Sequence, residues 1–331
     1  MKISVALCTY NGEKYINQQI DSILIQTLPV DEIIVCDDCS HDNTINILEK
    51  YSSINPGLFK IIKNDVNLKT VKNFEKAISL CSGEIIFLSD QDDIWAENKV
   101  AVFANYFKNH PNINVLASNG YCIDENSVIH EKYAVWDAPK FLEDKNYNVD
   151  YNLIIQISNI ATGASMAFRK SIVKEILPIP QIDDLYHDEW IALNSAKGNN
   201  FKLINEKLFS YRIHKNQQLG GTFLDKTEDT KINLIDYFNL DDENLTFEKL
   251  KHKLNKLCVA NDKNKFRFEN HNLSNSIFKK NLIEVQQIYK NTRKKMRKIN
   301  PFSSIILELK DKFRNERQLK KNTSNFSGYY C

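Results

Sequence analysis

The fold of this chain is decided by a short stretch at residues 82–95, SGEIIFLSDQDDIW. Its centre, Glu84 to Leu88, is an apolar run bounded by polar residues, which is typical of a buried strand. Three carboxylates follow the run at once, at Asp90, Asp92 and Asp93. The stretch therefore predicts a buried strand with a carboxylate cluster at its carboxyl end.

The segments before this stretch repeat the same plan. Each predicted strand is followed by an amphipathic helix, with strands at 3–8, 32–36 and 59–62 and helices ending near 24, 51 and 81. Strands that alternate with helices at this pitch favour a parallel sheet with helices on both faces. Ligands of such sheets bind at the carboxyl ends of the strands. The sequence thus predicts an α/β fold whose site is built from the polar residues that follow its strands.

The carboxylate cluster has two interpretations. Three carboxylates in four positions repel one another, and a divalent cation relieves this repulsion. Oxygen ligands of this kind suit Mg²⁺ or Mn²⁺. The alternative is a solvated turn in which Asp93 caps a helix that starts near Trp95.

A second pair of carboxylates, Asp37 and Asp38, ends the strand at 32–36. A carboxylate there can accept a hydrogen bond from a ribose hydroxyl or a base N–H, or it can cap a helix. Asp42 is the better cap, because it stands just before the next helix, so Asp38 is expected to face a ligand. Neither GxGxxG nor GxxxxGK[ST] occurs in the sequence, so metal and side chains must hold any bound diphosphate.

Composition and charge set the class of protein. With 331 residues, 42% hydrophobic and 26% charged, the chain is globular. Its apolar runs are far shorter than the roughly 20 residues of a membrane span, and the N-terminus has no cleavable signal pattern. These features predict a cytoplasmic protein.

The formal net charge of +2 is unevenly distributed along the chain. Residues 249–321 are strongly basic, with 21 Lys and Arg against 6 Asp and Glu, so the remainder is acidic. These basic residues surround an apolar stripe at Phe278, Leu282, Val285 and Tyr289. The region is either a solvated helical surface or a surface that rests on anionic lipid at the inner face of the membrane. The stripe could also dock on the catalytic domain or on a second copy of the chain, as a homodimer. Nucleic acid is not expected as a partner, because the acidic remainder would repel it.

Several ordered motifs resemble those of family 2 glycosyltransferases of the GT-A fold. They are ISVALCTYNG at 3–12, IIVCDDCSHDNT at 33–44, NPG at 55–57, the Asn-rich run at 67–77 and SGEIIFLSDQDDIW at 82–95. SDQDDIW, together with HDEW at 187–190 and YRIH at 211–214, is similar to the bacterial rhamnosyltransferase-like branch. The resemblance implies a GT-A (Rossmann-like) catalytic domain over 1–220, followed by a basic, mainly helical region over 221–331.

The resemblance implies a metal-dependent, inverting transfer of a sugar from a nucleotide diphosphate sugar to a hydroxyl of a glycan or lipid-linked acceptor. Rhamnose is a candidate sugar, and bacterial surface polysaccharide synthesis, of capsule or O-antigen, is the expected setting. The reaction needs a cation on the leaving diphosphate, a pocket for the nucleoside and a base on the far side of the anomeric carbon.

Each need corresponds to residues that match the family motifs. Asp92 matches the metal ligand, with Asp90 nearer the ribose, Asp93 in support and His214 as a further ligand to Mn²⁺ or Mg²⁺. Asp188 matches the base, and its alternative role is the N-cap of a helix. The donor site matches Thr9, Tyr10, Asn11, Asp38, Asn73 and, at the diphosphate, Arg212.

The sequence departs from the family pattern at two positions. Lys69 stands where a glycine is usual, and His187 precedes Asp188 where many relatives carry an acidic residue. Gly163 falls near the presumed acceptor cleft, although a plain turn would also explain it.

Two other classes of function fit parts of the pattern. A receiver-like phosphoacceptor module also carries an Asp pair after one strand and an Asp after another, but it places the pair after its first strand. A catalytically inactive nucleotide-sugar-binding scaffold would keep the fold, and the intact Asp92 and Asp188 argue against it.

Overall fold

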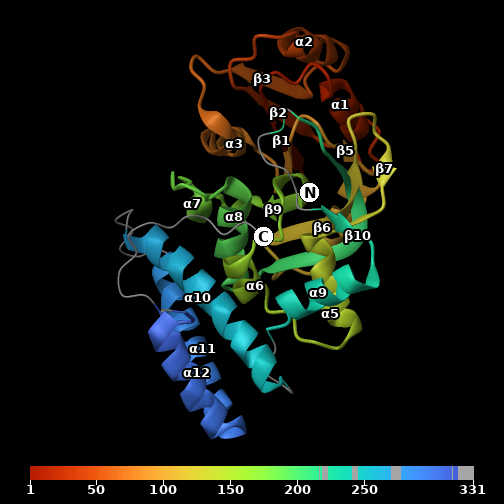
Figure 1. The fold of residues 1–331 in the computed structure, drawn as a ribbon. Helices are drawn as coiled ribbons and strands as arrows, with labels where there is room; N and C mark the ends of the chain where they lie inside the picture. The colour runs from red at the N-terminus through yellow and green to blue at the C-terminus, as the bar shows by residue number, and fades with distance from the viewer. Residues whose placement is uncertain (216, 218–222, 241–244, 270–276, 315, 320–331) are drawn as a thin grey trace. The chain divides into compact units, whose positions relative to one another are not determined.

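The computed structural model describes residues 1–215, 217, 223–240, 245–269, 277–314 and 316–319 (Figure 1). These residues form two compact units. The sheet unit comprises Met1–Phe141, Ile160–Gln181 and Leu185–Leu234, and the helical unit comprises the described parts of Leu142–Asn159, Ile182–Asp184 and Ile235–Cys331. Two segments that precede residue 220 in the chain therefore pack with the C-terminal helices.

The sheet unit is built on one large mixed sheet with the strand order β3-β2-β1-β4-β9-β6-β10-β5. Its first four strands are parallel to one another, as predicted, and they are β1 (Ile3–Thr9), β2 (Glu32–Asp37), β3 (Phe59–Lys63) and β4 (Ile85–Ser89). β9 (Met166–Arg169) runs antiparallel between β4 and β6 (Val115–Ile123). β10 (Phe201–Arg212) pairs with β6 and runs parallel to it.

Short strands complete the sheet unit. β5 (Ile94–Trp95) and β7 (Ile129–His130) extend the large sheet, and β8 (Lys132–Ala134) pairs with β11 (Phe223–Asp225). The helices that lie around the sheet are α1 (Ile16–Leu24), α2 (Thr44–Ile54), α3 (Lys69–Leu80), α4 (Lys99–Asn109), α7 (Val173–Ile176), α8 (His187–Ala196) and α9 (Glu228–Phe238) (Figure 1). This architecture confirms the predicted α/β fold.

Burial explains why the central strands read as continuous apolar runs. All five residues of β4 are buried, as are Val5, Ala6 and Leu7 in β1, because helices cover both faces of the parallel part of the sheet. Apolar side chains pack on both sides of these strands, so the polar residues can only follow at the strand ends. The core therefore fixes where the functional side chains are placed.

Two local features decide how helices begin beside the site. The N-cap of α2 is Asn43, one position after the predicted cap Asp42, although the Asp42 Oδ1 atom accepts hydrogen bonds from the backbone N–H and the hydroxyl of Thr44 at the start of the helix. Lys69, the first residue of α3, has a φ of 63°, in the left-handed region. A glycine adopts that conformation without strain, which explains why the family pattern has glycine there.

The helical unit holds α6 (Tyr151–Ile157), α10 (Phe247–Glu269), α11 (Ile277–Ile299) and α12 (Pro301–Arg314), while α5 (Ala138–Asp144) joins the two units along the chain. Its core includes Leu250, Leu254, Met296 and Leu307. Phe278 and Val285 of the predicted α11 stripe are fully buried within this unit. These two residues of the stripe are thus used in packing within the unit, whereas Leu282 and Tyr289 are partly exposed.

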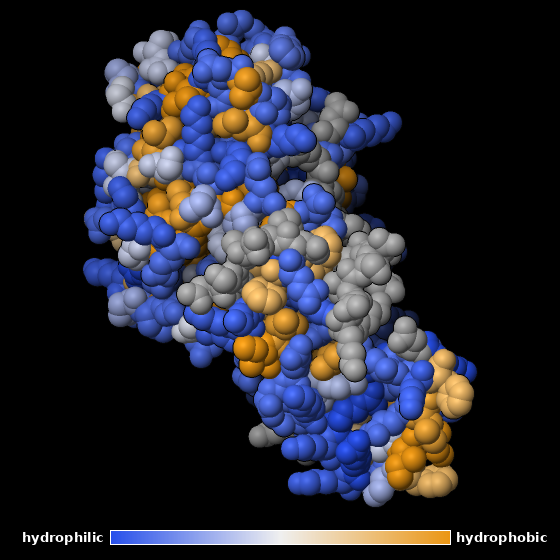
Figure 2. All heavy atoms as spheres, turned by 90° about the vertical axis from the view of Figure 1, so that its left-hand side faces the viewer, coloured by the Kyte–Doolittle hydropathy of each residue, from blue (hydrophilic) through white to orange (hydrophobic). Residues whose placement is uncertain are grey.

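The last helix, α12, has an unusual arrangement of its two faces. Its inward face carries Ser304, Leu307 and Asp311, and the Asp311 carboxylate, 1% exposed, accepts hydrogen bonds from Arg293 at 2.7 Å and Arg317 at 2.7 Å. The outward face is apolar, with exposed side chains at Phe302, Ile305, Ile306, Leu309 and Phe313. Figure 2 shows hydrophobic residues gathered at the lower end of the C-terminal helices, where Figure 1 places α12.

Candidate active site

A cavity of about 780 Å³ opens in the sheet unit at the carboxyl ends of β1, β2 and β4. Side chains from distant parts of the chain meet around it. Of the residues predicted for the site, the cavity is lined by Thr9, Tyr10, Asp38, Asn73, Asp90, Asp92, Asp93, Asp188, Arg212 and His214. Asn11 is the exception among them.

Asn11 holds a turn beside the cavity. Its side-chain Oδ1 atom accepts a hydrogen bond from the backbone of His41 at 2.8 Å, and its own N–H donates to Ser40 Oγ at 2.8 Å. With a φ of 50°, Asn11 adopts the left-handed conformation that Asn tolerates better than most residues. The residue therefore joins the loops that follow β1 and β2.

Asp38 is buried at the end of β2 and is already engaged in the protein. Its carboxylate accepts hydrogen bonds from the backbone N–H groups of Leu68 and Lys69, at 2.7 and 2.8 Å, and from the Asn64 side chain at 2.8 Å. Asn73 completes this network, because Asn64 also donates to its Oδ1 atom. A carboxylate has about four acceptor positions, so Asp38 both anchors the start of α3 and keeps capacity for one ligand contact.

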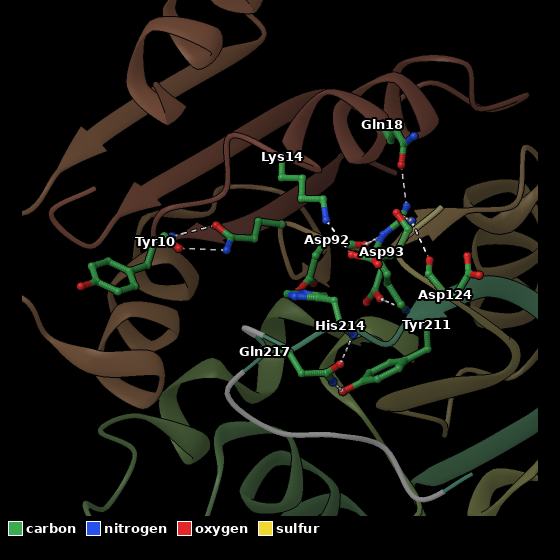
Figure 3. Close-up of polar contacts among 12 residues, drawn as sticks. Tyr10, Lys14, Gln18, Asp92, Asp93, Asp124, Tyr211, His214 and Gln217 are labelled. Atoms are coloured by element: carbon green, nitrogen blue, oxygen red, sulfur yellow. Dashed lines mark hydrogen bonds and ion pairs between the residues drawn. The ribbon is translucent and has the colours of Figure 1, made fainter. Parts of the chain in front are cut away.

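The carboxylate loop after β4 makes a direct contact with the segment after β10. The Asp92 Oδ2 atom lies 2.8 Å from His214 Nε2, and Figure 3 shows the two side chains facing each other. The His214 ring packs against Tyr15, with ring centroids 4.8 Å apart. The structure thus brings together two of the predicted metal ligands, which are 122 positions apart in the chain.

Asp93 is buried and does not cap a helix. The helix predicted near Trp95 begins at Lys99, as α4. The Asp93 Oδ1 atom accepts a hydrogen bond from the backbone of Arg212 at 3.0 Å, whereas its Oδ2 atom has no partner in the described part of the chain. Burial, with Asp92 and Asp90 nearby, raises the pKa of this carboxyl well above its usual range.

Asp90 is held among other carboxylates. Burial, followed by the proximity of Asp92 and Asp188, raises its pKa to about 8. The buried ammonium of Lys99 opposes this shift. Lys99 donates to the backbone oxygen of Ala164 at 2.6 Å and lies 4.2 Å from the Trp95 ring centroid. We did not predict a role for Lys99 from the sequence, because a lysine at a helix start is ordinarily a surface residue.

Arg212 positions the carboxylate loop. Its side chain is 1% exposed and donates to the backbone oxygens of Asp92 at 2.7 Å and Asp124 at 3.0 Å, and to Gln18 Oε1 at 2.6 Å (Figure 3). These contacts tie β10 to the loop after β4, to α1 and to the end of β6. The guanidinium thus has a structural role that was not predicted, and its contact with a phosphate stays a prediction.

Asp188 lies in the first turn of α8. Its Oδ2 atom accepts from the Gly163 N–H at 3.1 Å and its Oδ1 atom accepts from the Glu189 N–H at 2.6 Å. The N-cap of α8 is Tyr186, so the N-cap alternative for Asp188 is wrong. Burial raises the pKa of Asp188 to about 7. A carboxylate with such a pKa is suited to take a proton at neutral pH.

The cavity brings together three chemical features. They are the Asp92 carboxylate paired with the His214 imidazole, the unpartnered Oδ2 atom of Asp93, and the Asp188 carboxyl with its raised pKa. Within the described residues, no group of three or more His, Cys, Asp or Glu side chains is already assembled around a metal position. The carboxylates at Asp90, Asp92 and Asp93 nevertheless fit a divalent cation, because their repulsion and the unpaired oxygen of Asp93 are relieved by one.

Similar folds occur among solved glycosyltransferases. The structure of Staphylococcus aureus TarS in complex with UDP-GlcNAc is 20% identical in sequence with a TM-score of 0.53, and the match covers 92% of this chain and 83% of that one. A mannosyltransferase from Pyrobaculum calidifontis, PcManGT, in complex with GDP-Man and Mn²⁺, is 13% identical with a TM-score of 0.50, and the match covers 95% and 80%. These likenesses establish the GT-A fold.

Relatives found by sequence are also named as sugar transferases. An uncharacterised glycosyltransferase of Nostoc sp. is 26% identical, over 65% of this chain and 65% of its own length. A dTDP-rhamnosyl transferase, RfbG, of Shigella flexneri is 26% identical, over 69% of this chain and 78% of its own. The family model described as glycosyl transferase family 2 matches residues 4–177, which include β1 to β4 and the carboxylate loop. This chain, with its parallel strands and the cavity at their ends, belongs to glycosyl transferase family 2.

Proposed function

We propose that this protein is a metal-dependent, inverting glycosyltransferase of bacterial surface polysaccharide synthesis. It moves a sugar from a nucleotide diphosphate sugar to a hydroxyl of a glycan or lipid-linked acceptor. The observation that carries the proposal is the placement of Asp188, with its pKa raised to about 7, in the same cavity as the Asp92–His214 pair. An inverting transfer needs a base and a diphosphate site in one cavity.

Asp92 and His214, supported by Asp90 and Asp93, are the residues that would hold a divalent cation. A bound Mn²⁺ or Mg²⁺ would neutralise the charge that develops on the leaving diphosphate. Arg212 supports this site because its guanidinium donates to the backbone oxygen of Asp92 and so fixes the loop. The complex of PcManGT with GDP-Man and Mn²⁺ supports this assignment at the level of the fold.

The proton of the acceptor hydroxyl goes to Asp188. As the acceptor oxygen bonds to the anomeric carbon, the bond from that carbon to the diphosphate oxygen breaks, and the proton moves to the carboxylate. The Gly163 N–H orients the Asp188 Oδ2 atom. Because the pKa of Asp188 is about 7, the carboxylate is half ionised at neutral pH and gains ionisation as the pH rises.

The nucleoside occupies the part of the cavity near Thr9, Tyr10, Asp38 and Asn73 in this proposal. dTDP-rhamnose is the first donor to test, because RfbG is named a dTDP-rhamnosyl transferase. UDP-GlcNAc is the second, because TarS was solved with it. Membership of a glycosyltransferase family removes the receiver-like alternative.

A binding and turnover panel tests the proposal. Purified protein is heated with dTDP-rhamnose, UDP-GlcNAc or GDP-mannose, with and without Mn²⁺, and the release of nucleoside diphosphate is followed. A donor at 100 times its dissociation constant should stabilise the protein by about 2.7 kcal/mol, in a Mn²⁺-dependent manner. Binding without turnover, in the presence of acceptor extracts, would instead identify an inactive scaffold, and no binding at all would overturn the proposal.

We also propose that the helical unit attaches peripherally to an anionic membrane through α12. Among the described residues, no helix combines the length and hydropathy that a membrane span requires. The apolar face of α12 is open, with Phe302 74% and Phe313 91% exposed. At 100° per residue, Lys310 and Lys312 fall on opposite sides of that face. An apolar stripe flanked by lysines is the pattern of a helix that lies in a lipid interface.

Vesicle flotation tests this attachment. The full-length protein should float with vesicles that contain anionic phosphatidylglycerol and remain unbound with neutral phosphatidylcholine, because each lysine near an anionic surface adds on the order of 1 kcal/mol. The double variant Leu309→Ser, Phe313→Ser should lose flotation. If it instead keeps flotation, or if the wild-type protein forms a dimer that these substitutions dissociate, the membrane proposal is wrong.

A further inference from the structure

His187 is a buried polar side chain for which the mechanism above has no use. It is the first residue of α8, one position before Asp188, and it lines the cavity. The residue is 4% exposed, and its ring stacks on Phe74 with centroids 3.9 Å apart and planes inclined by 18°. Neither ring nitrogen has a hydrogen-bond partner within the described part of the chain.

Gly163 lies directly against this ring. A Cβ atom placed on Gly163 would lie 2.8 Å from His187 Nε2 and 3.7 Å from Asp90 Oδ2. Any larger residue would therefore collide with the imidazole at the wall of the cavity, which Gly163, His187 and Asp90 all line. The backbone N–H of the same glycine holds Asp188. The ring, Asp90 and the segment that orients the base thus line the same part of the cavity.

The unpartnered nitrogens weaken the folded protein. A buried polar group without a hydrogen bond is unfavourable, and a phenylalanine would stack on Phe74 without that loss. Burial also lowers the pKa of His187 to about 3, so the ring is neutral and presents one donor and one acceptor. A side chain that is unfavourable for folding and lines the cavity is explained by a ligand that supplies the missing hydrogen-bond partner.

We propose that His187 is a positioning residue whose Nε2 atom contacts a hydroxyl of the transferred sugar in the bound donor. This inference rests on the proposed function and assigns the sugar end of its donor site. A hydroxyl fits because it both donates and accepts, so it can donate a hydrogen bond to Asp90 and still accept one from the N–H of the neutral imidazole.

The position next to the base also favours the sugar over the nucleoside. The base must stand by the anomeric carbon, and His187 is adjacent to it in the chain. The proposed nucleoside contacts at Thr9 and Asp38 come instead from the ends of β1 and β2. His187 is thus placed to distinguish one sugar from another without touching the nucleotide.

Calorimetric titration of donors against their nucleotides tests the assignment. The pairs are dTDP-rhamnose with dTDP, UDP-GlcNAc with UDP, and GDP-mannose with GDP, all with Mn²⁺. His187→Phe should weaken binding of the preferred sugar nucleotide roughly tenfold, the effect of losing one hydrogen bond, and change binding of the bare nucleotide less than about twofold. His187→Gln, which keeps an N–H donor, should restore part of the loss.

The thermal midpoint of the unliganded protein is the second readout. His187→Phe should leave it unchanged or raise it, since the unpartnered nitrogens are removed, whereas a purely structural histidine would lower it when replaced. His110→Phe is the matched control, because His110 also stacks on an aromatic ring, that of Tyr106 at 4.0 Å, and does not line the cavity. It should leave every affinity unchanged.

The outcomes separate the two proposals. If the wild-type protein binds none of the nucleotides, the proposed function fails and the role of His187 falls with it. If the wild-type protein prefers a sugar nucleotide and His187→Phe keeps that preference in full, only the present inference is overturned. The same holds if both the sugar nucleotide and the bare nucleotide weaken equally, because His187 would then act on the nucleotide site.

Discussion

Replacing Asp188 by asparagine should inactivate the protein and stabilise it at the same time. In the folded protein the pKa of Asp188 is about 7, against an ordinary value of 3.8. The folded state therefore holds a proton up to about pH 7 that the unfolded chain releases near pH 4. Through this group, stability is lost as the pH rises from about 4 to 7. Because asparagine cannot ionise, the Asp188→Asn variant does not lose this part of its unfolding free energy as the pH rises.

The size of the effect follows from the shift. About three pKa units correspond to an upper bound of about 4 kcal/mol at pH 8. Because Asp188 is half-buried and water screens its charge in part, we expect about 1–2 kcal/mol. The side-chain oxygen of the introduced asparagine can still accept from the Gly163 N–H, so the loop stays in place. Turnover should fall by about 10² to 10⁴, the usual contribution of a general base.

Urea unfolding from pH 4 to 8, followed by tryptophan fluorescence, measures how this group changes the free energy of unfolding. The difference in unfolding free energy between Asp188→Asn and wild type should be smallest near pH 4, grow in favour of the variant as the pH rises to about 7, and level off above that. Glu189→Gln is the control, because Glu189 is adjacent and does not line the cavity. A difference that is independent of pH, or full turnover in the Asp188→Asn variant, would refute the assignment of Asp188 as a buried base of raised pKa.

Three further predictions concern the supporting residues. Asp92→Asn should abolish the rise in thermal midpoint that Mn²⁺ produces in the presence of nucleotide, since it removes the partner of His214; an unchanged rise would place the metal elsewhere. Arg212→Gln should destabilise the protein by about 3 kcal/mol or more in urea melts, because two loops and helix α1 lose a buried charged donor, and a loss below about 1 kcal/mol would contradict that role. Phe278→Ala should cost about 3–5 kcal/mol in the helical unit while donor binding persists, as measured by calorimetry, and a neutral result would show that Phe278 is not a core residue.

The sheet and the edge that carries the cavity could be predicted because their signals are local. Buried parallel strands such as β4 are apolar on both faces, and the polar residues that follow them must collect at one edge. The family motifs then picked out residues at the ends of β1, β2 and β4, and the cavity lining includes nearly all of them. The family and the α/β fold are both confirmed.

The remaining features depend on contacts between distant residues. From the sequence, Arg212 is a surface cation or a phosphate ligand. Only the packing of β10 beside the loop after β4 shows that it binds the backbone oxygen of Asp92, 120 positions away. Lys99 and His187 become significant only through burial beside carboxylates. The helix expected from Trp95 begins four positions later, since Ile94 and Trp95 pair with β10 instead.

The exposed apolar face of the helical unit is not the one that the sequence pattern indicates. The periodic stripe on α11 was the strongest apolar signal in the basic region, and Phe278 and Val285 are used inside the unit. The open face belongs to α12, which turns Asp311 inward because Arg293 and Arg317 neutralise it there. Periodicity identifies an apolar face but does not reveal which helix of a bundle is left uncovered.

The central claim is an inverting sugar transfer with Asp188 as base, and the anomeric configuration of the first product tests it most directly. The wild-type protein is incubated with its preferred sugar nucleotide and Mn²⁺, with acceptor or with water as a slow acceptor, and the product is followed by proton NMR. We expect nucleoside diphosphate release that depends on Mn²⁺, a first-formed product with the opposite anomeric configuration to the donor, and loss of both in Asp188→Asn. A product that keeps the donor configuration, or release that Asp188→Asn leaves unchanged, would contradict it.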